Sequence, residues 1–148
     1  MLRRVVGALE AAQVRRFGRS AISLVARTPV VLLHTTGRRT GIERVTTVAY
    51  HRDLDGSLLI VGGAGGQKRI PDWVANLRAN PAAEVTLDRR RRRVTATELG
   101  GADRSEVWTR LVHVWPRIER YERRAGRPIP VIRLTPAGRT PPMTPEPN

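Results

Sequence analysis

The sequence contains no cysteine, and this absence excludes disulfide bonds, thiolate catalysis and cysteine-ligated metals. Imidazole is offered only by His34, His51 and His113, and none of them has metal-ligand spacing to another histidine or to a carboxylate. We therefore predict no metal site. The few serines lie in no nucleophile-elbow sequence, which argues against the commonest hydrolase mechanism.

Lysine is nearly absent as well, because every basic residue except Lys68 is arginine, and the net charge is +14 at pH 7. Such a charge favours contact with phosphate-rich partners. The densest run, residues 89–93, stands where a turn between two strands is expected, and it lacks the aromatic residues that single-strand nucleic-acid binders interleave with their charge. We favour a solvated hairpin tip over an anion-binding patch, and we expect no specific nucleic acid partner.

The N-terminal segment has no hydrophobic run of secretory or membrane-spanning length. Residues 1–28 instead place apolar side chains near helical spacing with arginines between them, which predicts a basic amphipathic helix. Such a helix suits packing on its own domain, self-association, or contact with an anionic membrane surface. We expect a cytoplasmic protein, with attachment at the inner face of the plasma membrane as the alternative, and the oligomeric state stays open.

The remaining chain has room for one domain built around a single core. Apolar or β-branched runs predict short strands over residues 30–34, 44–50, 58–61, 84–87, 94–97 and 129–134. Short strands joined by tight turns favour an α+β domain with an antiparallel sheet, closed into a small barrel over residues 29–135. Residues 136–148 are rich in proline without apolar periodicity and predict a disordered tail.

Three helices are predicted between these strands. Pro71 marks the start of the first, because proline suits the first helical position. Asp103 and Glu106 have the spacing of a capping box at the start of the second. Pro116 separates the second from a third helical piece, which ends at Gly126.

Two loops rich in glycine and arginine each follow an apolar strand, at residues 35–41 and 62–69. Glycine allows positive φ and turns backbone N–H groups toward a bound anion, while guanidinium groups pair phosphate or carboxylate oxygens two at a time. The second loop leads into the helix after Pro71, whose N-terminal end also favours negative charge. Together the loops predict a cradle for an anionic cofactor.

These two loops, their order, and residues 73–81 resemble the deazaflavin (F420)-dependent nitroreductase and quinone reductase family of actinobacteria. The likeness continues through Trp115, Pro116, Tyr121 and residues 129–130, so it covers roughly residues 30–135. It implies a split β-barrel with short helices, like that of the flavin-reductase type. It also implies coenzyme F420, a deazaflavin with a phosphodiester and a polyglutamate tail, as the cofactor.

The resemblance assigns roles to named positions. The residues that would grip the tail are Arg38, Arg39, Thr40, Gly41 and Arg44, in agreement with the loop chemistry. Those that would lie beside the ring or close its pocket are Thr46, Thr47, Val48, Gly62, Gly63, Ala64, Gly65, Gly66, Asp72, Trp73 and Asn76. Those that would face the substrate are Ala49, Trp115, Ile118 and Tyr121. For Trp73, packing against Leu77 in the core is an alternative that we weight equally with a role in the cofactor pocket.

The sequence also departs from the family pattern. Many relatives have Ser-Lys where this chain has Gly63 and Ala64, and Lys68 or Arg69 would have to replace the missing cation. Of the tyrosines that line the substrate side in the best-known nitroreductases, only Tyr121 keeps a phenol. We therefore expect a more apolar substrate pocket.

The resemblance implies an oxidoreductase that transfers hydride from reduced F420 to a quinone, an enone or a nitroaromatic compound. Tyr121 is the candidate donor of a hydrogen bond or proton to the reduced acceptor, and structural packing of its ring is the alternative. Other functions stay open. They are a non-catalytic carrier of deazaflavin, a protein that binds flavin mononucleotide (FMN) by the same phosphate argument, and, least favoured, a nucleic-acid-binding protein.

Overall fold

A computed structural model of the protein describes residues 28–63 and 66–138. Nearly all of the helix predicted for residues 1–28 and most of the tail predicted for residues 136–148 therefore lie outside the described residues. Within the described ranges, no helix has the length and apolar character needed to cross a membrane.

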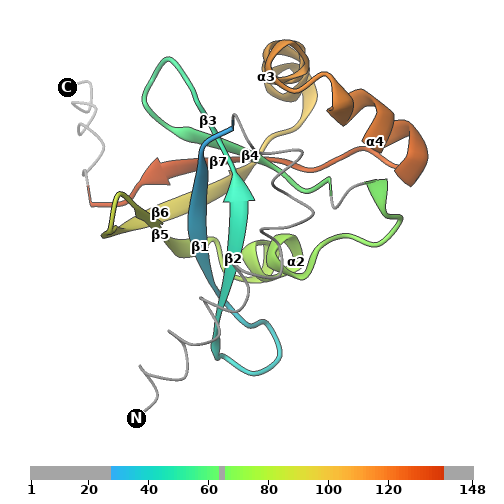
Figure 1. The fold of residues 1–148 in the computed structure, drawn as a ribbon. Coiled ribbons are helices and arrows are strands. Elements are labelled where there is room, and N and C mark those ends of the chain that lie inside the picture. Colours follow the sequence, from blue (N-terminus) through green and yellow to red (C-terminus); the bar gives the residue numbers. More distant parts are fainter. Residues whose placement is uncertain (1–27, 64–65, 139–148) are drawn as a thin grey trace, which may run out of the picture.

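The described chain forms one antiparallel sheet that curls into a split barrel (Figure 1). The strands lie in the order β2-β1-β5-β6-β7-β4-β3, so β2 and β3 are at the two edges. Their bounds are Val30–Thr36 for β1, Glu43–Ala49 for β2, His51–Arg52 for β3, Leu58–Val61 for β4, Ala82–Leu87 for β5, Arg90–Glu98 for β6 and Val131–Pro136 for β7. The predicted α+β barrel is confirmed.

Each of the predicted strands is present, with differences at the ends. The two-residue strand β3 was not predicted, because it is too short to show alternation. The last strand begins at Val131 and continues to Pro136, beyond the predicted end at residue 134. Val94 pairs with Pro136, and the N–H of Ala137 donates to the carbonyl of Arg93 at 3.0 Å. A proline is tolerated there because it ends the strand. Placing residue 136 in a disordered tail was therefore wrong.

The arginine run at residues 89–93 is only partly a hairpin tip. The turn consists of Asp88 and Arg89, whose φ angles are 51° and 64°, and β6 already begins at Arg90. Two successive residues with positive φ are typical of the hairpin turn whose twist matches that of the strands. Four of the five arginines of the run are therefore strand residues, which corrects the prediction of a turn.

Three helices accompany the sheet in the described part of the chain: α2 at Asp72–Ala79, α3 at Gly101–Val114 and α4 at Arg117–Ala125. α4 ends at Gly126 with φ of 65°, as predicted. Pro71 is the residue directly before α2, one position earlier than the predicted first helical position. The capping box was wrong, because α3 begins at Gly101 and has no side-chain cap. Figure 1 shows α3 and α4 together on one side of the sheet and α2 near the β1–β2 loop.

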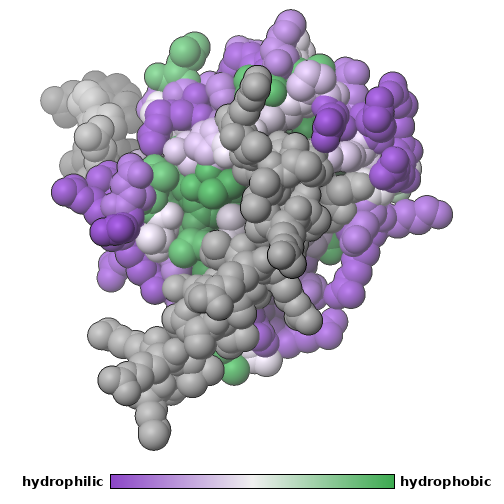
Figure 2. All heavy atoms as spheres, viewed as in Figure 1, coloured by the Kyte–Doolittle hydropathy of each residue, from purple (hydrophilic) through white to green (hydrophobic). Residues whose placement is uncertain are grey.

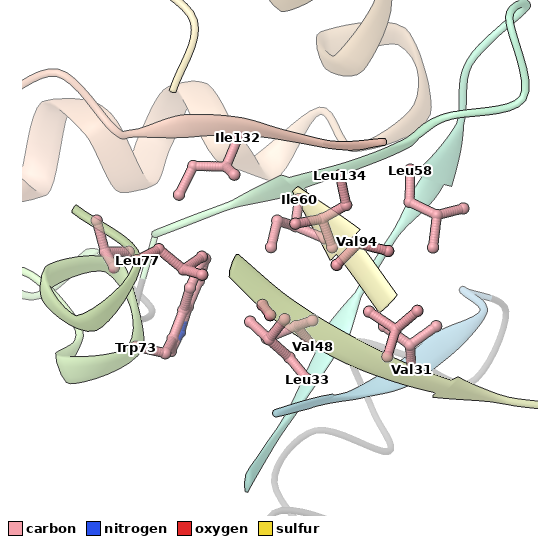
Figure 3. Close-up of a cluster of buried hydrophobic side chains, with 13 residues drawn as sticks. Val31, Leu33, Val48, Leu58, Ile60, Trp73, Leu77, Val94, Ile132 and Leu134 are labelled. Atoms are coloured by element: carbon pink, nitrogen blue, oxygen red, sulfur yellow. The ribbon is translucent and has the colours of Figure 1, made fainter. Parts of the chain in front are cut away.

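Two hydrophobic clusters account for the packing. The larger lies inside the curled sheet and is closed by α2, whose Trp73 and Leu77 point toward the strand side chains (Figure 3). The smaller joins the outer side of β4 and β7 to α3 and α4, with members Leu59, Val107, Leu111, Ile118 and Val131. Residues 58–60 are buried on both faces of the sheet, which explains why β4 is a continuous apolar run.

Candidate cofactor-binding site

The β1–β2 loop is a tight turn that fixes the direction of its arginines. Gly37 donates its N–H to the carbonyl of Ile42 at 2.8 Å, and the Thr40 hydroxyl accepts from the N–H of Ile42 at 3.2 Å. A Cβ on Gly37 would lie only 2.8 Å from Oγ1 of Thr40 and 2.9 Å from the carbonyl oxygen of Ile42, and Gly41 has φ of +70°. Glycine is therefore required at both positions.

Asn76 of α2 ties this loop to the helix. Its Oδ1 accepts from the backbone N–H of Arg38 at 3.2 Å and from Nη1 of Arg38 at 3.0 Å. Its Nδ2 donates to Oγ1 of Thr35 at 3.3 Å, and Asn76 is only 3% exposed. Because the buried amide is satisfied on both sides, Asn76 fixes Arg38 and β1 relative to α2.

Asp72, the first residue of α2, draws the second loop to the same place. Its Oδ1 lies 3.4 Å from Nη2 of Arg38 and 3.0 Å from Nη2 of Arg69. Asp72 thus holds one guanidinium from each loop, and the two loops meet as their chemistry predicted.

A cavity of about 510 Å³ lies where the loops and α2 meet. Its lining carries four guanidinium groups and only one carboxylate, Asp72. Arg39 and Arg44 form no ion pair or side-chain hydrogen bond with any other described residue. Their donors are available to a bound anion, and guanidinium groups favour phosphate and carboxylate oxygens. The residues that line the cavity are Gly37, Arg38, Arg39, Thr40, Arg44, Val45, Thr46, Arg69, Asp72, Trp73 and Asn76.

Eight predicted site residues are in this lining, and the other residues predicted on β2 are not. Register places Val48 opposite Val31, and Val48 belongs to the buried core at 9% exposure. Thr47 and Ala49 are on the opposite face of β2 from Thr46, because successive side chains alternate. Trp73 both lines the cavity and packs in the core with Leu77, so both interpretations of it hold.

The glycine segment after β4 is built for close packing. The N–H of Gly62 donates to the carbonyl of Pro130 at 2.9 Å, and that of Gly66 donates to Gly63 at 2.8 Å. A Cβ on Gly62 would lie 2.8 Å from Cγ2 of Val74 in α2, and one on Gly66 would crowd Arg124. These N–H groups are already bonded within the chain. Residues 64 and 65 lie outside the described residues.

Three of the four residues predicted to face the substrate lie on or beside α4, and the fourth, Ala49, is the last residue of β2. Tyr121 is half-buried, and a Cβ on Gly63 would lie 3.6 Å from its ring, so its side chain lies against the glycine segment. Ile118 is buried at 3% exposure in the smaller cluster. Trp115 packs on that cluster and meets the ring of His51 edge to face, with 6.4 Å between the ring centroids. Its buried Nε1 has no hydrogen-bond partner within residues 28–63 and 66–138.

Three lining residues were assigned no role in the predicted site, Gly37, Val45 and Arg69, although Arg69 was named with Lys68 as a replacement for the missing cation. Arg69 carried a signal, since it ends the second loop, and Gly37 belongs to the first. The role of Asn76 as the link to Arg38 has no local signal, because the two residues are 38 positions apart.

A search among known proteins agrees with the resemblance. The model of the family described as F420H(2)-dependent quinone reductase matches residues 7–136. The chain belongs to this family. An F420H(2)-dependent quinone reductase of Mycobacterium tuberculosis is 38% identical over 122 residues, which cover 80% of each chain.

Solved structures agree on the fold. The structure of an F420-H2-dependent reductase (FDR-A) aligns with a TM-score of 0.63 and 31% identity, over 72% of this chain and 93% of that one. A heme storage protein of Vibrio cholerae aligns with a TM-score of 0.56 over 81% of this chain and 89% of its own. It is only 11% identical, so it supports the fold alone.

Proposed function

We propose that the protein is an F420-dependent reductase of quinones, and that the cavity between the β1–β2 loop and α2 holds the charged tail of the cofactor. One observation carries the placement: Arg39 and Arg44 line this cavity beside Arg38 and Arg69, and neither has an ionic partner in the described part of the chain. This donor set fits a phosphodiester followed by glutamyl carboxylates, because each oxygen pair can accept two parallel N–H bonds.

The residues of the cavity would have two roles in holding such a tail, direct binding and positioning. Arg39 and Arg44 bind it directly, whereas Asn76 and Asp72 position Arg38 and Arg69 before it arrives. Positioning in advance reduces the side-chain entropy lost on binding. Bound reduced deazaflavin would supply the hydride, and the protein supplies orientation and exclusion of water.

The ring and its acceptor would lie toward the glycine segment and α4. Tyr121 lies against Gly63 there, and we propose its phenol as the donor of a hydrogen bond or proton to the reduced quinone. The buried Nε1 of Trp115 is a second donor on the same side of the fold. For a quinone dissolved in lipid, we propose that residues 1–28 contact an anionic membrane surface, on the strength of their basic amphipathic pattern.

The cavity is tested by changing its two unpartnered arginines. The Arg39→Ala/Arg44→Ala variant is expected to bind F420 more weakly by about one to several kcal/mol, the scale of two charge-assisted hydrogen bonds, with an unchanged melting temperature. The matched control is Arg120→Ala/Arg123→Ala, which removes the same charge from two exposed arginines of α4 whose side chains have no partner among the described residues. If the two variants bound F420 with the same affinity, the tail of the cofactor would have to bind elsewhere.

Turnover is tested separately by adding the protein to reduced F420 with a panel of quinones and following deazaflavin oxidation. The panel includes an enone and a nitroaromatic compound, the other predicted acceptor classes. Oxidation with quinones is the expected result. Stoichiometric F420 binding without turnover of any acceptor would instead support a carrier, and tighter binding of FMN than of F420 would overturn the cofactor assignment.

A further inference from the structure

A second cavity, of about 490 Å³, lies at the opposite end of the strands from the proposed cofactor site. The strand register fixes this placement. The cofactor cavity is next to the end of β1 where Thr36 pairs with Glu43. Along β5, which runs antiparallel to β1, the far end is the pair Leu87 and Arg90 at the β5–β6 turn, and these residues line the second cavity.

The floor of this cavity is apolar. Val94 and Val85, 5% and 3% exposed, contribute from β6 and β5, and Leu58 and Leu134 from the paired strands β4 and β7. All four belong to the larger core cluster, so the cavity is an opening onto the core itself.

The rim of the cavity is cationic. Side chains alternate along a strand, so Arg90 and Arg92 are on the same inward face of β6 as buried Val94. Arg91, on the outer face, is paired with Glu84 and Glu43. The inward pair differs, because neither Arg90 nor Arg92 has a side-chain partner among the described residues.

The rest of the rim leaves the positive charge uncompensated. Arg52 of β3 joins it and donates only to the carbonyl of Gly56, at 3.2 Å. Asp88 is the one carboxylate in the lining. Figure 2 shows hydrophilic residues at the tip of the β5–β6 hairpin with hydrophobic residues beside them. If the arginine run served only to keep the hairpin in water, its unpaired members Arg90 and Arg92 would not be expected to border an opening onto the core.

We propose that this cavity binds an anionic amphiphile, a molecule with one carboxylate or phosphate head and an apolar chain. The guanidinium groups of Arg90, Arg92 and Arg52 would bind the head, and the chain would cover the floor around Val94. This site is separate from the proposed F420 site, so it stands or falls independently of the cofactor assignment.

The test uses decyl phosphate, below its micelle concentration, with the full-length protein and no F420. Calorimetry gives the affinity, and methyl NMR locates the probe. We expect saturable binding with shifts at Leu58, Val85 and Leu134. Binding of inorganic phosphate and of 1-decanol should each be weaker by about tenfold or more, because each lacks one half of the interaction. Equal affinity for either one, or shifts confined to other residues, would overturn the proposal.

Charge-matched variants complete the test. Arg90→Gln/Arg92→Gln should bind decyl phosphate at least about tenfold more weakly, while Arg120→Gln/Arg123→Gln should stay within about twofold of the parent. All four arginines are exposed, so folding should be unaffected, and melting temperatures check this. If both variants lost the same affinity for decyl phosphate, the loss would come from net charge alone and the proposed site would be wrong. If the protein bound only to vesicles of phosphatidylglycerol, and not to decyl phosphate monomers, the proposed binding in the cavity would be wrong and a contact with the membrane surface would explain the result.

Discussion

His34 is a buried titratable residue whose charge state is set by its surroundings on β1. It is 4% exposed, and its Nε2 lies 2.7 Å from Oγ1 of Thr86. Burial lowers its pKa from 6.5 to about 4, and the charge of Arg91 acts in the same direction. Glu43 is 3.6 Å from Nδ1, but that carboxylate is paired with Arg91. His34 is therefore neutral in the folded protein near neutral pH.

This shift predicts a pH dependence of stability. The unfolded chain binds the His34 proton more tightly than the folded protein does. Neutral His34 therefore contributes fully to the free energy of unfolding above pH 6.5, and this contribution is lost as the pH falls toward about 4. The loss should reach about 3 kcal/mol, at roughly 1.4 kcal/mol per pKa unit. Urea unfolding across this range should show a smaller decrease for His34→Gln than for the parent. Exposed His113→Gln, the matched control, should follow the parent, and parallel curves for all three proteins would contradict the assignment.

At the scale of elements, Asp53 joins the β3–β4 loop to α3 and β7. It is 8% exposed and accepts from Nη2 of Arg110 at 3.0 Å and from Nη1 of Arg133 at 2.7 Å. Burial opposes its charge. Hydrogen bonds from Arg133 and the N–H of Leu54, with both guanidinium charges, nevertheless hold the pKa of Asp53 below its usual value.

Removing this charge should loosen three elements together. We expect Asp53→Asn to lower the free energy of unfolding by about 2 kcal/mol, less than for a fully buried pair because both arginines keep some contact with water. Denaturant unfolding measures it. Glu106→Gln is the control, since Glu106 pairs with the same Arg110 at 3.4 Å but is 76% exposed. It should cost about 0.5 kcal/mol or less, and an equal loss in both variants would contradict a special role for Asp53.

The contact of the β4 end with α2 gives a second element-scale prediction. Because a Cβ on Gly62 would lie 2.8 Å from Cγ2 of Val74, Gly62→Ala should destabilise the protein by about 1–3 kcal/mol. Val74→Ala alone should also destabilise it by leaving a cavity. In the double variant the new methyl group fills part of that space, so the combined loss should be smaller than the sum. Additive losses in denaturant unfolding would show that the contact is not tight.

These elements also show which features a sequence reveals. Continuous apolar or β-branched runs predicted β1 and β4, because burial requires such runs. The turn at Asp88 and Arg89 was misplaced, since positive φ is usually signalled by glycine or asparagine and neither is present. At the site, arginines and glycines marked the two loops, but Asn76 joins Arg38 only through the tertiary fold. Local patterns therefore predicted which loops carry the guanidinium groups, and not the residues that orient these groups.

At the scale of the whole molecule, positive charge is distributed over both ends of the barrel. Arg38, Arg39 and Arg44 are at one end, and Arg90 and Arg92 are at the other. Separated clusters of this kind attract any polyanion weakly, whereas one convergent cavity binds a compact anion with defined geometry. The net charge of +14 is therefore compatible with a cofactor-binding enzyme that contacts nucleic acid only non-specifically.

This distribution predicts that salt weakens the binding of two ligands to very different extents. Mixed-sequence double-stranded DNA should bind at about 50 mM salt and lose most of its affinity by about 200 mM, because binding through several phosphates releases several counterions. F420 should lose much less affinity over the same range, since fewer charges are involved and hydrogen bonds of fixed geometry contribute. Fluorescence anisotropy of labelled DNA and the intrinsic fluorescence of F420 report the two affinities in the same buffers. DNA affinity that persists at the higher salt would indicate a dedicated nucleic-acid site, because non-specific attraction alone cannot survive that screening.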